Sequence, residues 1–140
     1  MTVHATAAFD VTGWDQTPQE GVPSPPHLSR ATVRKTFRGD LTGESTAELL
    51  MCQADPKDLT AGAGYVASET VIGTLGGREG RFVIQHWGLS GPDGQQTGGH
   101  VVPGSGTGDL TGLTGTVEIA VGADGTHTLM LAYHLSPERG

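Results

Sequence analysis

Polar and apolar residues alternate along most of the chain, whereas apolar residues at helical spacing do not continue beyond a turn or two. Such alternation is typical of strands that have one buried face. A clear example is the segment 30–37, where Ala31, Val33 and Phe37 share one face and polar residues stand between them. The sequence therefore predicts an all-β fold.

Turn signals separate the alternating segments, and about eight strands are expected in total. They span residues 4–14, 30–37, 45–52, 65–75, 81–89, 100–103, 116–121 and 126–135. The prolines between Pro18 and Pro26 end the first strand, because proline cannot donate a ladder hydrogen bond. The segment 91–99, GPDGQQTGG, is expected to be a flexible loop.

Strands that follow one another in hairpins form either a two-sheet sandwich or a closed up-and-down barrel. A small antiparallel β-barrel is favoured, since a barrel has no free edges and since Gly73, Gly106 and Gly108 would allow tight coiling. The pentapeptide GDLTG occurs at 39–43 and 108–112, each at an expected hairpin turn. Repeated turn chemistry explains this better than a duplicated half-barrel, because the similarity does not extend into the flanks.

Composition limits the classes of function. The 140 residues fit one domain, 1–140, and the 23 glycines agree with a turn-rich fold. The net charge of -7 argues against a nucleic acid or an anionic membrane as partner. A single cysteine excludes an internal disulfide framework. The chain has no apolar run of about 18 residues and no secretory signal at its start, so a cytoplasmic location is expected.

The hairpin formed by 65–75 and 81–89 has the clearest register. A four-residue turn, or a two-residue turn at Gly77 and Arg78, sets Glu69 opposite His86. On the same face Val71 would stand opposite Ile84, and Gly73 opposite Phe82. This face is the more apolar one, so it is expected to face the lumen, with Val71, Phe82 and Ile84 as ligand contacts.

A carboxylate and an imidazole placed side by side among apolar groups shift each other's pKa values, which is the chemistry of a general acid/base pair. Glu69 and His86 are therefore candidate catalytic residues. The alternative is structural, because a hydrogen bond between the two groups would also satisfy them and fix the register. A three-residue turn or a bulge would instead put Gln85 or Trp87 opposite Glu69.

Four further residues are candidate ligand contacts. Arg34 and Glu48 lie on the neighbouring hairpin, although such residues on barrel strands more often face solvent. Trp14 ends the first strand and would either plug the barrel or line a pocket. Tyr133 and His134 are adjacent on the last strand, so only one of them can face inward.

Metal and cofactor sites are not expected. The six histidines show no HxH or HxxxH spacing, and Cys52 has no basic neighbour in sequence, so it is interpreted as a small apolar group. The glycine-rich GSGTG segment at 104–108 lacks the following lysine and helix of a phosphate-binding loop. For the same lack of a helix, it is not a nucleophile elbow.

Long stretches of the chain resemble a bacterial family of uncharacterised single-domain proteins with an allene-oxide-cyclase-like barrel. The resemblance rests on residues 63–88, on VVPGSGTGDLTGLTG at 101–115, on residues 125–135 and on K-x-F-x-G-D-L-x-G at 35–43. It also includes the region of Trp14 and covers nearly the whole chain.

The resemblance implies the barrel fold. The segment at 104–115 is similar to the glycine turn of plant allene oxide cyclases and dirigent proteins, which direct a reactive intermediate through cyclisation or coupling without a cofactor. Relatives of this fold commonly form oligomers, so a homodimer is expected. His100 departs from the family pattern at a position expected near the mouth of the cavity.

Three hypotheses follow for the function. The barrel could bind a small apolar or amphipathic molecule as a carrier. It could be a cofactor-independent isomerase or cyclase, in which Glu69 and His86 move a proton. It could also be a structural or interaction protein whose interior is filled by side chains. An open cavity would favour the first two hypotheses, and a fully packed lumen would remove both.

Overall fold

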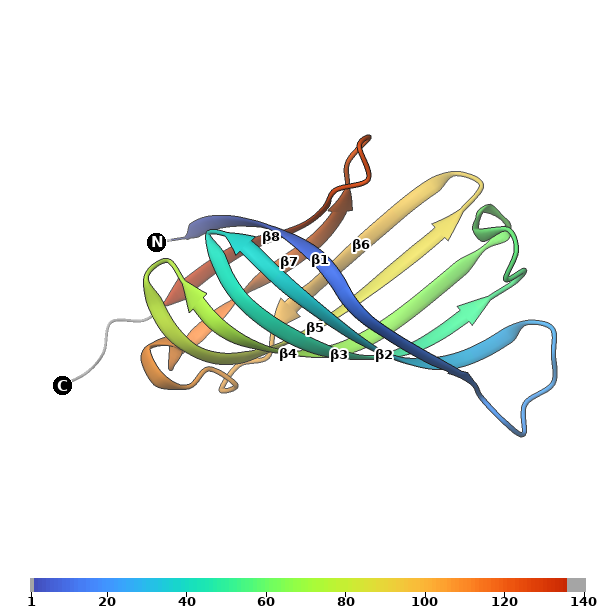
Figure 1. The fold of residues 1–140 in the computed structure, drawn as a ribbon, viewed down its shortest axis with the longest axis horizontal. Helices are drawn as coiled ribbons and strands as arrows, with labels where there is room; N and C mark the ends of the chain where they lie inside the picture. The colour runs from blue at the N-terminus through green and yellow to red at the C-terminus, as the bar shows by residue number, and fades with distance from the viewer. Residues whose placement is uncertain (1, 136–140) are drawn as a thin grey trace.

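Eight antiparallel strands pair in chain order, and β8 returns to β1 to close a barrel (Figure 1). The computed structural model describes residues 2–135, so the ends of the expected domain 1–140 lie outside the described residues. The strands are β1 (Val3–Pro18), β2 (His27–Gly39), β3 (Leu41–Gln53), β4 (Ala63–Leu75), β5 (Arg78–Gly91), β6 (Gly94–Val101), β7 (Leu113–Val121) and β8 (His127–Leu135). The expected barrel is confirmed, and the sandwich is wrong.

Helical structure within residues 2–135 is limited to two short 3-10 turns, η1 (Leu59–Ala61) and η2 (Gly108–Leu110). No helix in this described part of the chain has the length and hydropathy needed to cross a membrane.

The turn between β4 and β5 differs from the expected one. Leu75 pairs with Arg78 around a two-residue turn of Gly76 and Gly77, whose φ values are +57° and +82°. Two adjacent residues with positive φ form the tightest hairpin turn, and two glycines adopt it without steric cost. The expected two-residue turn lay one residue further along the chain, which changes each pairing partner by two positions, so the predicted opposition of Glu69 and His86 is wrong.

The observed pairs are Glu69 with Ile84, Val71 with Phe82 and Gly73 with Gly80, and His86 pairs with Ala67. A shift by two residues changes partners but keeps every side chain on its face, because the side-chain period of a strand is two. The assignment of this face to the barrel interior is confirmed: Glu69 and His86 are both buried.

The segment 91–99 is also different from the prediction. Most of it belongs to β6, which pairs with β5 from Gly91 opposite Gly94 to Ile84 opposite Val101. β6 forms because the barrel closes only if a strand pairs between β5 and β7. Backbone hydrogen bonds supply this pairing, whatever the β propensity of the side chains.

The connection from β6 to β7 contains η2 and the second GDLTG copy. Only the first copy lies at a hairpin turn, between β2 and β3, and Gly106 and Gly108 lie in this connection and not inside strands. A Cβ on Gly106 would come within 2.0 Å of the carbonyl oxygen of Leu110, so the chain folds tightly on itself here. Leu110 is fully buried and joins the core at this end of the barrel.

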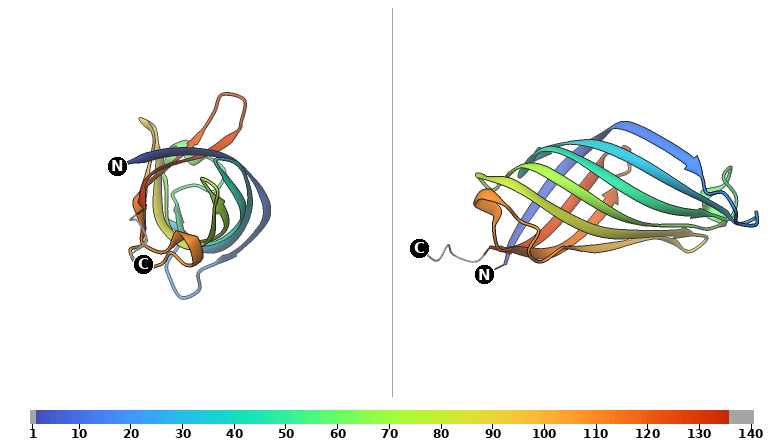
Figure 2. Two further views of the ribbon diagram at one scale, coloured as in Figure 1. Left: turned by 90° about the vertical axis from the view of Figure 1, so that its left-hand side faces the viewer. Right: turned by 90° about the horizontal axis from the view of Figure 1, so that it is seen from below.

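The barrel interior has two parts. Large side chains fill the half that ends at η2, here called the closed half, and its core includes Phe9, Phe37, Leu75, Phe82 and Leu110. A second cluster, here called the open half, consists of Ala31, Val33, Ala47, Leu49 and Ala67. The loops after β1, β3 and β5 surround the open end, opposite to η2 (Figures 1 and 2).

Candidate functional site

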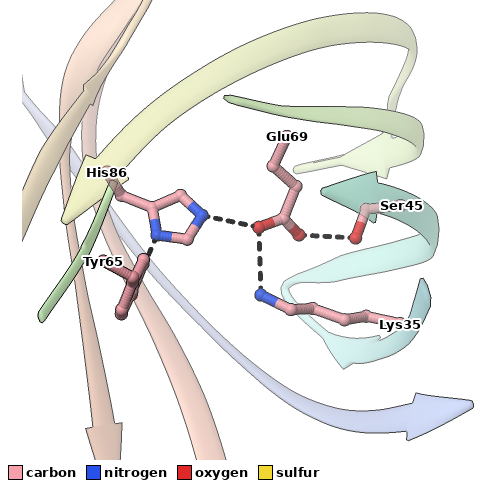
Figure 3. A network of polar contacts seen from close by, with 5 residues as sticks. All are labelled: Lys35, Ser45, Tyr65, Glu69 and His86. Atoms are coloured by element: carbon pink, nitrogen blue, oxygen red, sulfur yellow. Dashed lines mark hydrogen bonds and ion pairs between the residues drawn. The ribbon is translucent and has the colours of Figure 1, made fainter. Parts of the chain in front are cut away.

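Glu69 is the centre of a network of polar side chains, which are buried except for the half-buried Tyr65 (Figure 3). Its Oε1 accepts a hydrogen bond from Nζ of Lys35 at 3.0 Å and lies 2.8 Å from Nε2 of His86. Its Oε2 accepts a hydrogen bond from Oγ of Ser45 at 2.5 Å. The hydroxyl of Tyr65 lies 3.0 Å from Nδ1 of His86. These five residues, from four consecutive strands, are called the buried network.

Small neighbours make room for the imidazole of His86. On one side His86 pairs with Ala67 of β4, and on the other side with Gly99 of β6. A Cβ on Gly99 would come within 2.7 Å of the Cβ of His86, so the backbone of β6 approaches closely only because this residue is glycine.

The carboxylate of Glu69 is held ionised. Burial by itself raises its pKa, but the hydrogen bond from His86, the charge of Lys35 and the hydrogen bond from Ser45 together outweigh burial and lower the pKa to about 2. Nζ of Lys35 also lies 4.5 Å from the centre of the Phe9 ring, within the range of a cation–π contact. Glu69 therefore carries a charge at neutral pH, and its partners compensate for the loss of water.

Tyr65 keeps its proton. Burial, and the negative charge of Glu69, raise the pKa of the Tyr65 hydroxyl to about 12. Because an ionised carboxylate only accepts hydrogen bonds, Nε2 of His86 carries the hydrogen that points to Glu69. In the neutral imidazole Nδ1 then accepts from the Tyr65 hydroxyl, and in the imidazolium Nδ1 donates to it. The Tyr65–His86 contact can therefore pass a proton in either direction.

A cavity of about 340 Å³ opens at the strand ends of the open half, and Tyr65 forms part of its wall. The wall also includes Trp14, Thr97 and Ile119. The ring of Tyr65 lies over Gly88, where a Cβ would come within 2.4 Å of Cε1. A chain of hydrogen bonds thus leads from the cavity wall through His86 to the buried carboxylate of Glu69.

The expected ligand contacts lie in three places. Val71, Phe82 and Ile84 are fully buried in the closed half, away from the cavity. Tyr133, and not His134, faces inward, but it too belongs to the closed half.

Trp14 is the expected contact that lines the cavity. Its position opposite Val33 puts it on the inner face of the rim, where it is 52% exposed and its Nε1 donates to Oε1 of Gln16. It borders the cavity and does not plug the barrel.

Arg34 and Glu48 do not reach the lumen, and this expectation is wrong. Both are exposed on the outer wall, because the alternation of β2 and β3 turns Lys35 and Ala47 inward instead. The carboxylate of Glu48 accepts hydrogen bonds from Oγ1 of Thr32 on that wall.

Sequence reasoning missed Lys35, Ser45 and Tyr65 as members of the site. Lys35 stands between Val33 and Phe37 on the apolar face of its segment, so alternation alone places it inside. Its charge is the reason that it is easily read as a surface residue, since lysine is rarely buried without a partner. The buried carboxylate supplies that partner.

Groups of three or more metal-ligating side chains are absent from residues 2–135. Cys52 is half-buried and unpaired by a disulfide, and it borders the cavity.

Comparisons with known proteins agree on the fold and name no activity. A family model described as "Protein of unknown function (DUF3224)" matches residues 5–133. The crystal structure of a protein with unknown function from the DUF3224 family of Shewanella oneidensis MR-1 is 34% identical, with a TM-score of 0.80. The similarity covers 99% of this chain and 100% of that one. No curated protein matches the chain.

Proposed function

The chain belongs to the DUF3224 family, whose function is unknown, and from the geometry of its barrel we propose that it binds a small apolar or amphipathic molecule in the open half and acts on it as a cofactor-independent isomerase or cyclase. One observation carries the proposal. The hydrogen-bond chain from Tyr65 through His86 to Glu69 begins at the wall of the cavity and ends at a carboxylate that is sealed from water.

In the proposed step the protons balance within one cycle. Tyr65 gives its hydroxyl proton to an oxygen atom of the bound molecule, and the protonated Nδ1 of His86 replaces that proton. A carbon-bound proton of the ligand leaves to water at the open end. That water returns a proton to the Tyr65 hydroxyl, which passes it on to Nδ1 of His86. The product of this step is the enol tautomer of the ligand, so only the position of one hydrogen and of one double bond changes.

Glu69 acts through His86 in this proposal. It does not border the cavity, and its carboxylate fixes the orientation of the imidazole and stabilises the imidazolium form. Lys35 and Ser45 hold the carboxylate in place. Glu69 is therefore a positioning residue, while Tyr65 is the group that touches the ligand.

The resemblance to allene oxide cyclases and dirigent proteins also supports rearrangement over hydrolysis. Those proteins guide a reactive intermediate in a barrel without a cofactor, and the step proposed here likewise needs only proton transfer and a shaped cavity.

Two other functions are supported by particular observations. Every buried side-chain polar atom in the described residues has a hydrogen-bond partner, as a purely structural network in a carrier would also have. Leu50, Val66 and Trp87 are directly paired neighbours and are exposed on the outer wall, which supports an interaction role through that wall. A species of only 14.4 kDa in sedimentation would remove self-association through it.

The test uses 2-tetralone, an uncharged ketone whose α-hydrogens exchange through the enol. We expect the protein to accelerate deuterium exchange in D₂O, and Tyr65→Phe to lose about 100-fold of that acceleration while still binding the ketone. Tyr133→Phe is the matched control, since it removes the other tyrosine hydroxyl, in the closed half. Equal exchange rates in the two variants would exclude proton transfer through Tyr65 and His86. If the unmodified protein binds the ketone without accelerating exchange, the carrier function remains.

A further inference from the structure

We infer that the ligand of the open half is uncharged and presents an acceptor oxygen to the Tyr65 hydroxyl, so that carboxylates and other anions are not its natural ligands. This inference rests on the proposed function and specifies the class of molecule that the cavity takes.

The cavity offers no counter-ion for a charged ligand. Among the described residues, none of those that line it is Asp, Glu, Lys, Arg or His. Its polar groups are neutral amides and hydroxyls, which include Gln16, Gln53, Gln95 and Thr97. Moving an ion from water into such a site without a partner is strongly unfavourable. The net charge of -7 adds long-range repulsion of anions.

The buried cation nearest the relay is already used. Lys35 is 7% exposed, binds Glu69 at 3.0 Å and does not border the cavity. If it left Glu69 to meet a ligand carboxylate, a buried carboxylate would lose its ion pair. Lys35 therefore cannot act as the anion-binding group of the cavity.

The other residues of the cavity wall indicate that the ligand has an apolar part and a second part that accepts a hydrogen bond. Trp14, Met51, Ile119 and Val121 offer apolar surface, and the indole of Trp14 is half exposed at the rim. A flat apolar body would bury that surface. When His86 is protonated, its Nδ1 donates to the Tyr65 hydroxyl oxygen, so the one hydrogen of that hydroxyl is free for an acceptor on the ligand. The raised pKa of the hydroxyl keeps this hydrogen in place at neutral pH.

The experiment varies one substituent on one ring system. N-phenyl-1-naphthylamine serves as the neutral fluorescent probe, and four naphthalenes compete with it: 2-acetylnaphthalene, 2-ethylnaphthalene, 2-naphthoate and 2-naphthylmethylammonium. We expect the acetyl compound to bind about threefold to tenfold more tightly than the ethyl compound. Both charged compounds should bind at least about tenfold more weakly than the acetyl compound.

Two matched pairs of variants assign these differences to the cavity. Tyr65→Phe should abolish the preference for acetyl over ethyl, whereas Tyr133→Phe should leave it unchanged. Gln95→Lys adds a cation at the lining and should improve 2-naphthoate binding, whereas Gln85→Lys, on the outer wall, should not.

The outcomes separate the inference from the proposed function. If the probe and all four naphthalenes fail to bind, the proposed binding site is wrong. If the probe binds and 2-naphthoate competes as well as 2-acetylnaphthalene, the site stands and the uncharged class is wrong. An acetyl preference that survives in Tyr65→Phe would overturn the role of the hydroxyl.

Discussion

The closed and open halves of the barrel are built from the same eight strands and have the same inward alternation, yet their interiors differ. Phenylalanine and leucine side chains meet across the closed half, while alanines dominate the buried cluster of the open half. The cavity lies where the inward residues are small, at Ala63 and Gly88 for example. The size of the inward side chains, and not the number of strands, thus decides whether this barrel is filled or hollow.

Glu69 lies at the boundary between the two halves. On β3 it pairs with Ala47 of the open half, and on β5 with Ile84 of the closed half. The closed half excludes water from the carboxylate of Glu69. On the side of the open half, His86 and Tyr65 connect this carboxylate to the cavity wall by hydrogen bonds. A polar network in the middle of either half would have only one of these properties.

The largest expected difference between the two halves is the loss of stability when a large side chain of the closed half is removed. Phe82 is fully buried, so Phe82→Ala should lower the free energy of unfolding by about 3–5 kcal/mol. Trp14→Ala removes an even larger aromatic side chain from the open end, where it is half exposed, and should have a clearly smaller effect. Urea denaturation measures both values. Similar losses would mean that the two ends are packed alike.

The boundary carboxylate gives the next largest effect, as a dependence on pH. The folded-state pKa of Glu69 lies near 2, below the ordinary 4.5, so its ionised form stabilises the fold above pH 4.5. That contribution, on the order of 3 kcal/mol, is lost as the pH falls from 4.5 toward 2.

The pH effect is measured as the stability difference between the unmodified protein and Glu69→Gln, which should shrink across this window. Glu48→Gln, whose carboxylate is exposed on the outer wall, is the matched control. A difference for Glu69→Gln that stays constant from pH 6 to pH 3 would contradict the ionised, stabilising carboxylate.

The smallest expected effect comes from adding one methyl group to the open half. In Gly88→Ala the new Cβ would lie 2.4 Å from the ring of Tyr65, so the ring must move. We expect a loss of about 1–3 kcal/mol in stability and a weaker fluorescence response of N-phenyl-1-naphthylamine. Gly77→Ala is the control, since no atom lies within 4 Å of its Cβ position, although its positive φ adds strain. If probe binding were unchanged in Gly88→Ala, the ring of Tyr65 would not be part of the binding site of the probe.

Much of the fold could be predicted because alternation is a local property. It predicted the all-β fold and the inward face of Glu69 and His86, and this face survived an error of two positions in register. The choice of a barrel over a sandwich rested instead on the absence of free edges in a barrel. The strand β6 could not be predicted in the same way. Its residues are glycines, glutamines and a threonine over most of its length, and it forms because both neighbouring strands need a partner.

The site was only partly predictable for a similar reason. The site forms only when β2, β3, β4 and β5 pair in register, which brings Lys35, Ser45 and Tyr65 to Glu69 and His86. No local sequence pattern predicts these long-range contacts. Alternation places Lys35 inside, but only the structure shows which charge compensates for it. Arg34 was a candidate in its place, one position away and on the opposite face.

The span of the buried network along the chain has a consequence for folding. Lys35 and Glu69 are 34 positions apart, and the strand β3 must lie between them before they can meet. Their ion pair therefore forms only after β2, β3 and β4 have found their mutual register, at a stage when the entropy of loop closure has already been lost. A chain paired one residue out of step would turn Lys35 or Glu69 to the outer wall and gain nothing from the other. The network thus stabilises only the correctly aligned strands, because misaligned strands lack the Lys35–Glu69 ion pair.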